Sequence, residues 1–178
     1  MFPWGHAAVG YLAYTAVRLA RDRSIPIAWG PIAALAVGTQ FADLVDKPLA
    51  WELALLPTGR SLAHTFIVLV PVIGALWAFL PERRRLVGAF AVGWVTHLLA
   101  DARYPLMDGT LEGAGYLFWP LTALPPYEPS EHGLLEFFLE LRFTPEVRFQ
   151  FGLTALAAAV WLVGRYRSST GSPRSADS

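Results

Sequence analysis

Hydrophobic positions in this chain fall into five long runs, separated by polar or proline-containing stretches. The runs cover about residues 6–20, 26–42, 62–80, 86–101 and 147–164. Several of them are shorter than the ~20 residues that a helix needs to cross ~30 Å of hydrocarbon. Either flanking aromatic residues supply the missing length, or one helix is partly embedded in protein. The pattern predicts an all-α fold, an integral-membrane bundle of four or five transmembrane helices.

The composition favours the same class. The 178 residues are 54% hydrophobic and only 16% charged, whereas a soluble domain carries about a quarter charged residues. Basic and acidic residues number 14 each, so no net charge attracts nucleic acid, and no nucleic-acid partner is expected. The chain contains no cysteine, which excludes disulfides, thiolate metal sites and a thiol nucleophile.

The stretches outside the runs have patterns of their own. Residues 48–56 are predicted to form a short interfacial helix, and residues 131–143 an amphipathic extracytoplasmic helix. Residues 102–130 are rich in glycine, proline and aromatic residues and are predicted to form a long ordered loop. Residues 168–178 have the composition of a disordered cytoplasmic tail, which leaves residues 1–167 as one membrane domain.

The basic residues predict the orientation in the membrane. Nine of the 14 follow the first, third or fifth run: Arg18, Arg21, Arg23, Arg83, Arg84, Arg85, Arg165, Arg167 and Arg174. The positive-inside rule places these segments in the cytoplasm. The expected product is a multi-pass cell-membrane protein with its N-terminus outside and its C-terminus in the cytoplasm.

Three of the four histidines lie at the predicted outer ends of three different runs. His6 is near the start of the first run, His64 near the start of the third and His97 near the end of the fourth. Because successive transmembrane helices alternate in direction, these ends share one side of the membrane. Asp101 follows His97 by four positions and therefore projects from the same helical face.

Charged residues complete this candidate site. Asp43 and Asp46 close the second run; Asp43 is the favoured metal ligand, and Asp46 is either a ligand or a residue directly behind the ligands. Lys47 either offsets the negative charge or contacts an anionic substrate. Arg60, four positions before His64, offers a guanidinium to a phosphate or carboxylate, or anchors its segment at the head-group level. The predicted metal ligands are His6, Asp43, His64, His97 and Asp101, and the predicted catalytic residues are Asp46, Lys47 and Arg60.

Imidazole and carboxylate ligands in combination suit zinc, manganese or iron rather than calcium or magnesium, which prefer oxygen ligands alone. We expect zinc, with manganese or iron as alternatives. The candidates outnumber the four ligands of a closed structural zinc. An open catalytic ion, or two ions sharing a carboxylate, would account for the surplus and would lower the pKa of bound water toward ~7.

Several short stretches carry a family resemblance. In order, they are His6 with Gly10, GTQFADLVD at 38–46, GRSLAHT at 59–65, HLLAD at 97–101 and GYLFWPL at 115–121. Together they resemble the YdjM-like family of inner-membrane proteins, which are inferred to be metal-dependent hydrolases. The chain departs from the family pattern at Ala42, where proline is usual, and in the three-residue spacing from Asp43 to Asp46. The family is similar in its His/Asp arrangement to the zinc-dependent phospholipase C and P1 nuclease group, which implies a phosphoester substrate.

The leading hypothesis is a membrane-bound metal-dependent hydrolase that acts on a phosphoester at the extracytoplasmic surface. Arg60 and Lys47 would neutralise the developing anion, and membrane lipids, including a lipid head-group as substrate, are the expected partners. One alternative is a non-enzymatic metal-binding scaffold or ion-handling protein, although ligands gathered at one end of the helices argue against an ion pathway. The other is a structural bundle whose histidines only tie helix ends together. The sequence indicates no particular oligomeric state.

Overall fold

The computed structural model describes residues 1–107, 109–125 and 142–170. The regular elements in these ranges are helices, and they contain no strand. The long helices are α1 (Pro3–Asp22), α2 (Trp29–Lys47), α3 (Phe66–Phe79), α4 (Arg84–Met107) and α6 (Pro145–Thr170). Short helices are η1 (Pro48–Glu52), η2 (Pro81–Arg83) and η3 (Leu111–Phe118). Each of the five hydrophobic runs coincides with one long helix, so the all-α prediction is confirmed.

The predicted number of membrane crossings is not confirmed. Among the described residues, α6 is long and apolar enough to cross a membrane, and Phe66–Phe79 with Pro81–Arg103 pass together as a pair bent by 108°. α3 alone has 14 residues, or about 21 Å of helix. In α1, α2 and α4 the apolar length is interrupted by polar residues that are buried inside the protein: His6, Thr15, Thr39, Asp46, His97 and Asp101.

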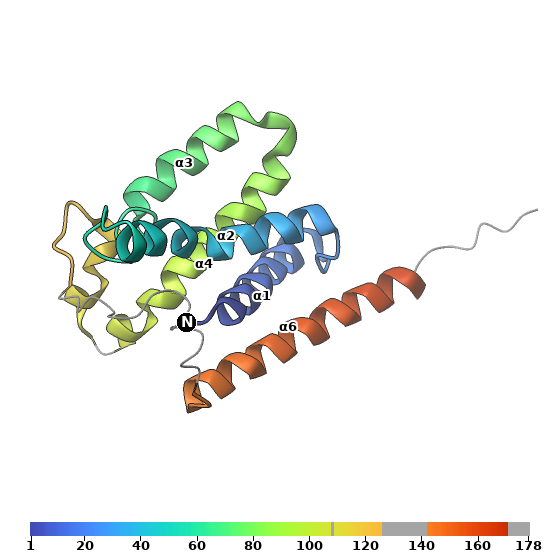
Figure 1. The fold of residues 1–178 in the computed structure, drawn as a ribbon. Coiled ribbons are helices and arrows are strands. Elements are labelled where there is room, and N and C mark those ends of the chain that lie inside the picture. The colour runs from blue at the N-terminus through green and yellow to red at the C-terminus, as the bar shows by residue number, and fades with distance from the viewer. Residues whose placement is uncertain (108, 126–141, 171–178) are drawn as a thin grey trace, which may run out of the picture.

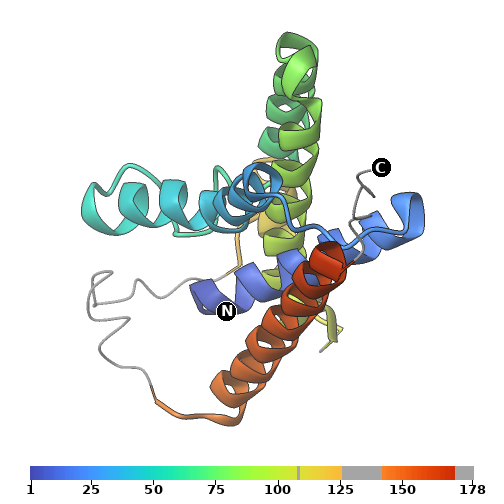
Figure 2. The same cartoon turned by 90° about the vertical axis from the view of Figure 1, so that its right-hand side faces the viewer.

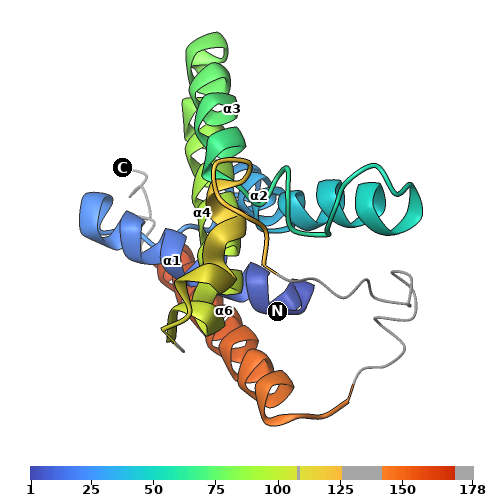
Figure 3. The ribbon, with the colours of Figure 1, turned by 90° about the vertical axis from the view of Figure 1, so that its left-hand side faces the viewer.

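The helices cross around α1 and α4 (Figure 1). α1 contacts α2, α4 and α6, and α2 contacts α4 most extensively. The hairpin of α3 and α4 extends away from α1 and α6, as the two turned views show (Figures 2 and 3). α2 and α4 approach closely because glycines lie at their contact: a Cβ atom at Gly38 would overlap the carbonyl of Phe90, and one at Gly93 the carbonyl of Leu35.

Two helix starts are set by threonine caps. Thr144, followed by proline, accepts a hydrogen bond from the Val147 N–H at 3.3 Å. Thr65 accepts hydrogen bonds from the N–H groups of Ile67 and Val68, at 2.9 and 3.3 Å. Such caps satisfy N–H groups that the first helical turn leaves without partners. The second cap fixes the direction in which the chain leaves His64 and enters α3.

Predictions for the connecting stretches had mixed outcomes. A short helix does form within residues 48–56, as η1. The predicted loop 102–130 is wrong where the structure describes it, because α4 continues to Met107 and η3 follows, burying aromatic and aliphatic side chains against α4. Residues 126–141, which include most of the predicted amphipathic helix 131–143, lie outside the described residues. The predicted tail 168–178 begins too early, because α6 extends through Thr170; residues 171–178 are likewise outside the description.

Candidate metal centre

Four side chains from three separate segments converge near the end of α2. Asp43 comes from α2, His64 from the segment before α3, and His97 and Asp101 from α4. One ligand atom from each lies within 4.8 Å of the others. His64 and His97 are fully buried, Asp101 is buried with 6% of its surface exposed, and Asp43 is partly buried.

The separations between these ligand atoms match those around a small ion. The Nε2 atoms of His64 and His97 are 3.2 Å apart. Asp43 Oδ1 lies 3.5 Å from the first and 3.7 Å from the second, and Asp101 Oδ2 lies 3.9 Å from His64 Nε2. A tetrahedral ion with bonds of about 2.0–2.2 Å separates its ligands by about 3.3–3.6 Å. The set therefore needs little movement to bind one.

The hydrogen bonds on the far side of each imidazole show which nitrogen faces inward without a proton. His97 Nδ1 lies 2.7 Å from the carbonyl oxygen of Thr39. A carbonyl only accepts, so Nδ1 carries the proton. His64 Nδ1 lies 2.8 Å from Asp46 Oδ2, and an ionised carboxylate imposes the same tautomer. In the neutral rings, both Nε2 atoms thus direct lone pairs at each other, at the same point that Asp43 Oδ1 approaches.

A cluster of lone pairs and carboxylate oxygens in a buried position favours a positive charge between them. Asp43 Oδ1 is a buried atom without a hydrogen-bond partner among the described residues. Metal-ligating histidines typically donate their other N–H to a carboxylate or a backbone carbonyl, as His64 and His97 do here. The residues present therefore fit a divalent cation that takes nitrogen and oxygen ligands, such as zinc.

The electrostatic surroundings of His64 point the same way. Burial lowers the pKa of His64, but the contacts of this ring with the Asp43 and Asp46 carboxylates and the charges of these carboxylates raise it above the usual range. The carboxylates therefore favour a positive charge on this ring or next to it.

Asp46 holds the segment that carries His64. Its carboxylate is fully buried and accepts hydrogen bonds from the backbone N–H groups of Ser61, Ala63 and His64, at 2.9, 2.8 and 3.2 Å. Trp94 holds the same segment from α4, because its indole N–H donates to the Ala63 carbonyl at 2.8 Å. Asp46 was predicted to be catalytic, as either a ligand or a residue directly behind the ligands; the structure places both of its oxygens behind His64, in contact with the segment 61–64.

His6 lies beside the four converging residues. Its Nε2 is 3.2 Å from Asp101 Oδ1, and its ring stacks on that of His97 at 3.9 Å between centroids. The amino group of Met1 is 3.1 Å from the same Asp101 oxygen. Asp101 thus turns one oxygen toward His6 and the other toward the converging group. A direct ligand role for His6 remains a prediction.

A model of the YdjM inner membrane protein family matches residues 1–170. The chain belongs to this family. Comparisons with curated proteins and with solved structures gave no match, so the expected likeness to zinc-dependent phospholipase C and P1 nuclease remains an expectation. Family membership confirms the predicted inner-membrane class, while the number of crossings and the orientation remain predictions.

In this YdjM-family protein, two cations lie at the rim of the site. Lys47 Nζ is 2.7 Å from Asp43 Oδ2, and an Arg60 guanidinium nitrogen is 3.2 Å from Asp101 Oδ2. The side chain of Lys47 is 15% exposed and that of Arg60 is 47% exposed, whereas those of His64 and His97 are 0% exposed. The site therefore opens toward Asp43, Lys47 and Arg60.

Tyr116 is a site residue that the sequence reasoning did not single out. It is 1% exposed and lies in η3, with its ring 6.2 Å from that of His64 and 5.8 Å from the Arg60 guanidinium carbon. Its hydroxyl is buried without a hydrogen-bond partner among the described residues. Burial raises the pKa of Tyr116; the charge of Arg60 lowers it and that of Asp101 raises it. The available signal was the stretch GYLFWPL, in which a tyrosine follows a glycine in a family motif.

Proposed function

We propose that this protein is a membrane-bound, metal-dependent hydrolase that acts on a phosphoester at the extracytoplasmic membrane surface. The supporting observation is the meeting of two imidazole Nε2 atoms, 3.2 Å apart, with the carboxylates of Asp43 and Asp101. Buried lone pairs and anionic oxygens arranged in this way favour a divalent cation. Zinc is the proposed ion, with manganese or iron as alternatives.

In this proposal His64, His97, Asp43 and Asp101 hold the ion, and the sequence-predicted ligand His6 positions Asp101. When bound, a divalent ion supplies an activated water and polarises the phosphoryl group. Asp46 keeps His64 in the tautomer and orientation that direct Nε2 inward. The ligands come from rigid helices and a hydrogen-bonded segment, which suits a catalytic site that must hold its geometry.

The exposed cations at the rim select an anionic substrate. The planar fork of Arg60 suits two phosphoryl oxygens at once, and Lys47 adds a point charge. Both now neutralise ligand carboxylates, so an ion bound in the centre would release them toward substrate. The Tyr116 hydroxyl, which keeps its proton because its pKa is raised, is placed to donate a hydrogen bond to the same group.

The proposed location favours a lipid phosphoester. If the arginine-rich ends of the helices face the cytoplasm, as the positive-inside rule predicts, the site lies at the outer head-group level. A phospholipid head-group can reach this level by lateral diffusion within the membrane. Membrane lipids are therefore the proposed substrate class.

One observation favours the non-enzymatic alternative, a metal-binding scaffold. The converging side chains are between 0% and 11% exposed, and an ion bound there would join α2, α4 and the segment before α3. Structural metal sites are closed in this way. Lys47 and Arg60 would then serve only to balance charge.

A single preparation tests these functions in sequence. The protein is purified in mild detergent, its metal content is measured, and hydrolysis of bis(p-nitrophenyl) phosphate is assayed. The hydrolase proposal requires bound metal and turnover that Asp101→Asn abolishes. Asp22→Asn is the matched control, since Asp22 is half exposed and pairs only with Arg18 on the described surface. Bound metal with no turnover of any phosphoester indicates the scaffold, and absence of bound metal indicates a structural bundle.

A further inference from the structure

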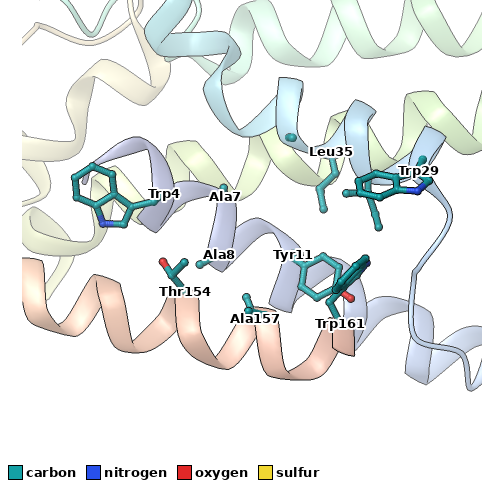
Figure 4. A pocket seen from close by; sticks show the side chains of 12 residues that line it. Trp4, Ala7, Ala8, Tyr11, Trp29, Leu35, Thr154, Ala157 and Trp161 are labelled. Atoms are coloured by element: carbon teal, nitrogen blue, oxygen red, sulfur yellow. The ribbon is translucent and has the colours of Figure 1, made fainter. Parts of the chain in front are cut away.

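A groove lined by apolar side chains lies between α1, α2 and α6, away from the metal centre. Its volume is about 430 Å³. It is wide because alanines from all three helices form its floor, while aromatic rings stand at its ends. Figure 4 shows Trp4 at one end and Tyr11, Trp29 and Trp161 at the other.

A basic pocket follows at the aromatic-rich end of this groove. Its volume is about 460 Å³, and no carboxylate lines it. Four arginines from three helical segments do: Arg18, Arg23, Arg85 and Arg167. Arg18 is already paired with Asp22 at 2.9 Å. The other three guanidinium groups have no ion pair to a carboxylate within the described parts of the chain, so the pocket carries an uncompensated positive charge.

The groove and the pocket lie next to each other. Trp29 and Trp161 line the groove with their rings 6.1 Å apart. Ala28, which precedes Trp29, and Gly164, three positions after Trp161, line the pocket. The Tyr11 hydroxyl, in the groove wall, donates a hydrogen bond to the carbonyl of Pro26, in the pocket wall, at 3.0 Å. The surface thus presents an apolar groove, then the two tryptophans, then the arginines. A phospholipid has the matching order of acyl chain, ester region and phosphate.

We propose that this surface is a specific site for one anionic phospholipid, with an acyl chain in the groove and the phosphate at Arg23, Arg85 and Arg167. Charge complementarity identifies the occupant: a basic pocket between helices attracts anionic head-groups, and the groove accepts only an apolar chain. The site is separate from the metal centre. His6 and Arg18 are 12 positions apart on α1, which is about 18 Å along a helix.

Lipid titration of the delipidated, detergent-solubilised protein tests the basic pocket of the proposed lipid site. Binding of phosphatidylglycerol and of phosphatidylcholine is followed by native mass spectrometry. Wild-type protein is expected to bind one phosphatidylglycerol in preference to phosphatidylcholine. Arg85→Gln/Arg167→Gln should weaken phosphatidylglycerol binding about 30-fold, since each charge near a head-group contributes about 1 kcal/mol. The control Arg21→Gln/Arg83→Gln removes equal charge outside the pocket and should leave binding unchanged.

A second pair of variants tests the apolar groove of the proposed lipid site without changing charge. Ala158→Phe fills the groove, which Ala158 lines, and should weaken both lipids. Ala159→Phe places the same ring on an exposed neighbouring position and should weaken neither. The proposal is overturned if the wild type binds both lipids with equal affinity. It is also overturned if a variant and its matched control bind lipid with equal affinity. A protein dimer that Ala158→Phe dissociates, with no lipid retained, would instead identify the groove as a contact between copies.

Discussion

Replacing Asp46 by asparagine tests how the metal centre is built. The carboxylate accepts four hydrogen bonds, three from backbone N–H groups and one from His64 Nδ1. An amide has one oxygen in place of two, so its NH₂ group must face at least one of these donors. Losing one charge-assisted hydrogen bond costs about 1.5–3 kcal/mol, which corresponds to a factor of about 10–150 in an equilibrium constant.

The affinity for zinc should therefore fall about 10- to 100-fold in Asp46→Asn, the usual range for a residue that orients a metal-bound histidine. The measurement is competition with a chromogenic chelator in detergent. Asp22→Asn makes the same chemical change on the surface and should leave the affinity unchanged. Asp43→Asn removes a converging carboxylate and should have the larger effect.

Two outcomes would refute the reasoning about Asp46. If Asp46→Asn bound zinc as tightly as Asp22→Asn, the four hydrogen bonds would have no part in positioning His64. If it lost as much affinity as Asp43→Asn while keeping its helical circular dichroism, Asp46 would be a ligand itself. Retained helicity is needed for the second comparison, because Asp46 also holds the segment that leads into α3.

The remaining predictions concern packing, chemistry, charge and orientation. Gly93→Ala places a methyl group against the backbone of α2, so thermal unfolding should show a loss of about 1–3 kcal/mol together with weaker metal binding; Gly74→Ala, with open space around it, should show neither. Tyr116→Phe should keep the bound metal but lower kcat for bis(p-nitrophenyl) phosphate by on the order of 100-fold, and an unchanged kcat would remove Tyr116 from the site. Lys47→Gln should raise the KM for this substrate about tenfold without reducing zinc affinity. A reporter fused after Ser178 should report a cytoplasmic location, and an external signal would place the metal centre on the inner side.

Hydrophobic periodicity was sufficient to locate the helices. Each long helix begins within four residues of a predicted run and ends within six, because such boundaries follow from proline, capping threonine and loss of apolar residues. The alternation of successive helices also predicted that His6, His64 and His97 would lie at one level. The structure places their side chains together, because the His97 ring contacts the rings of both His6 and His64.

The individual roles within the site depended on contacts that spacing does not encode. Asp43 and Asp46 are three positions apart on one helix; Asp43 was the favoured ligand, and Asp46 was predicted to be either a ligand or a residue directly behind the ligands. They differ because the segment 61–64 folds back so that its N–H groups reach Asp46. Tyr116 was overlooked for a similar reason, since only the packing of η3 against α4 brings it to Arg60.

The charges around the metal centre connect its structure with its proposed chemistry. Asp43 and Asp101 are balanced by Lys47 and Arg60, at 2.7 and 3.2 Å, so the carboxylates are already neutralised when the protein folds. A divalent ion bound there would add two positive charges at the same oxygens and weaken both ion pairs by repulsion. In the proposed function, Lys47 and Arg60 would then turn to the open side of the site and bind the phosphoester. For this reason removal of the Lys47 charge should spare zinc binding and weaken substrate binding. If Lys47 only supported the fold, its removal would change neither zinc affinity nor the KM for the substrate.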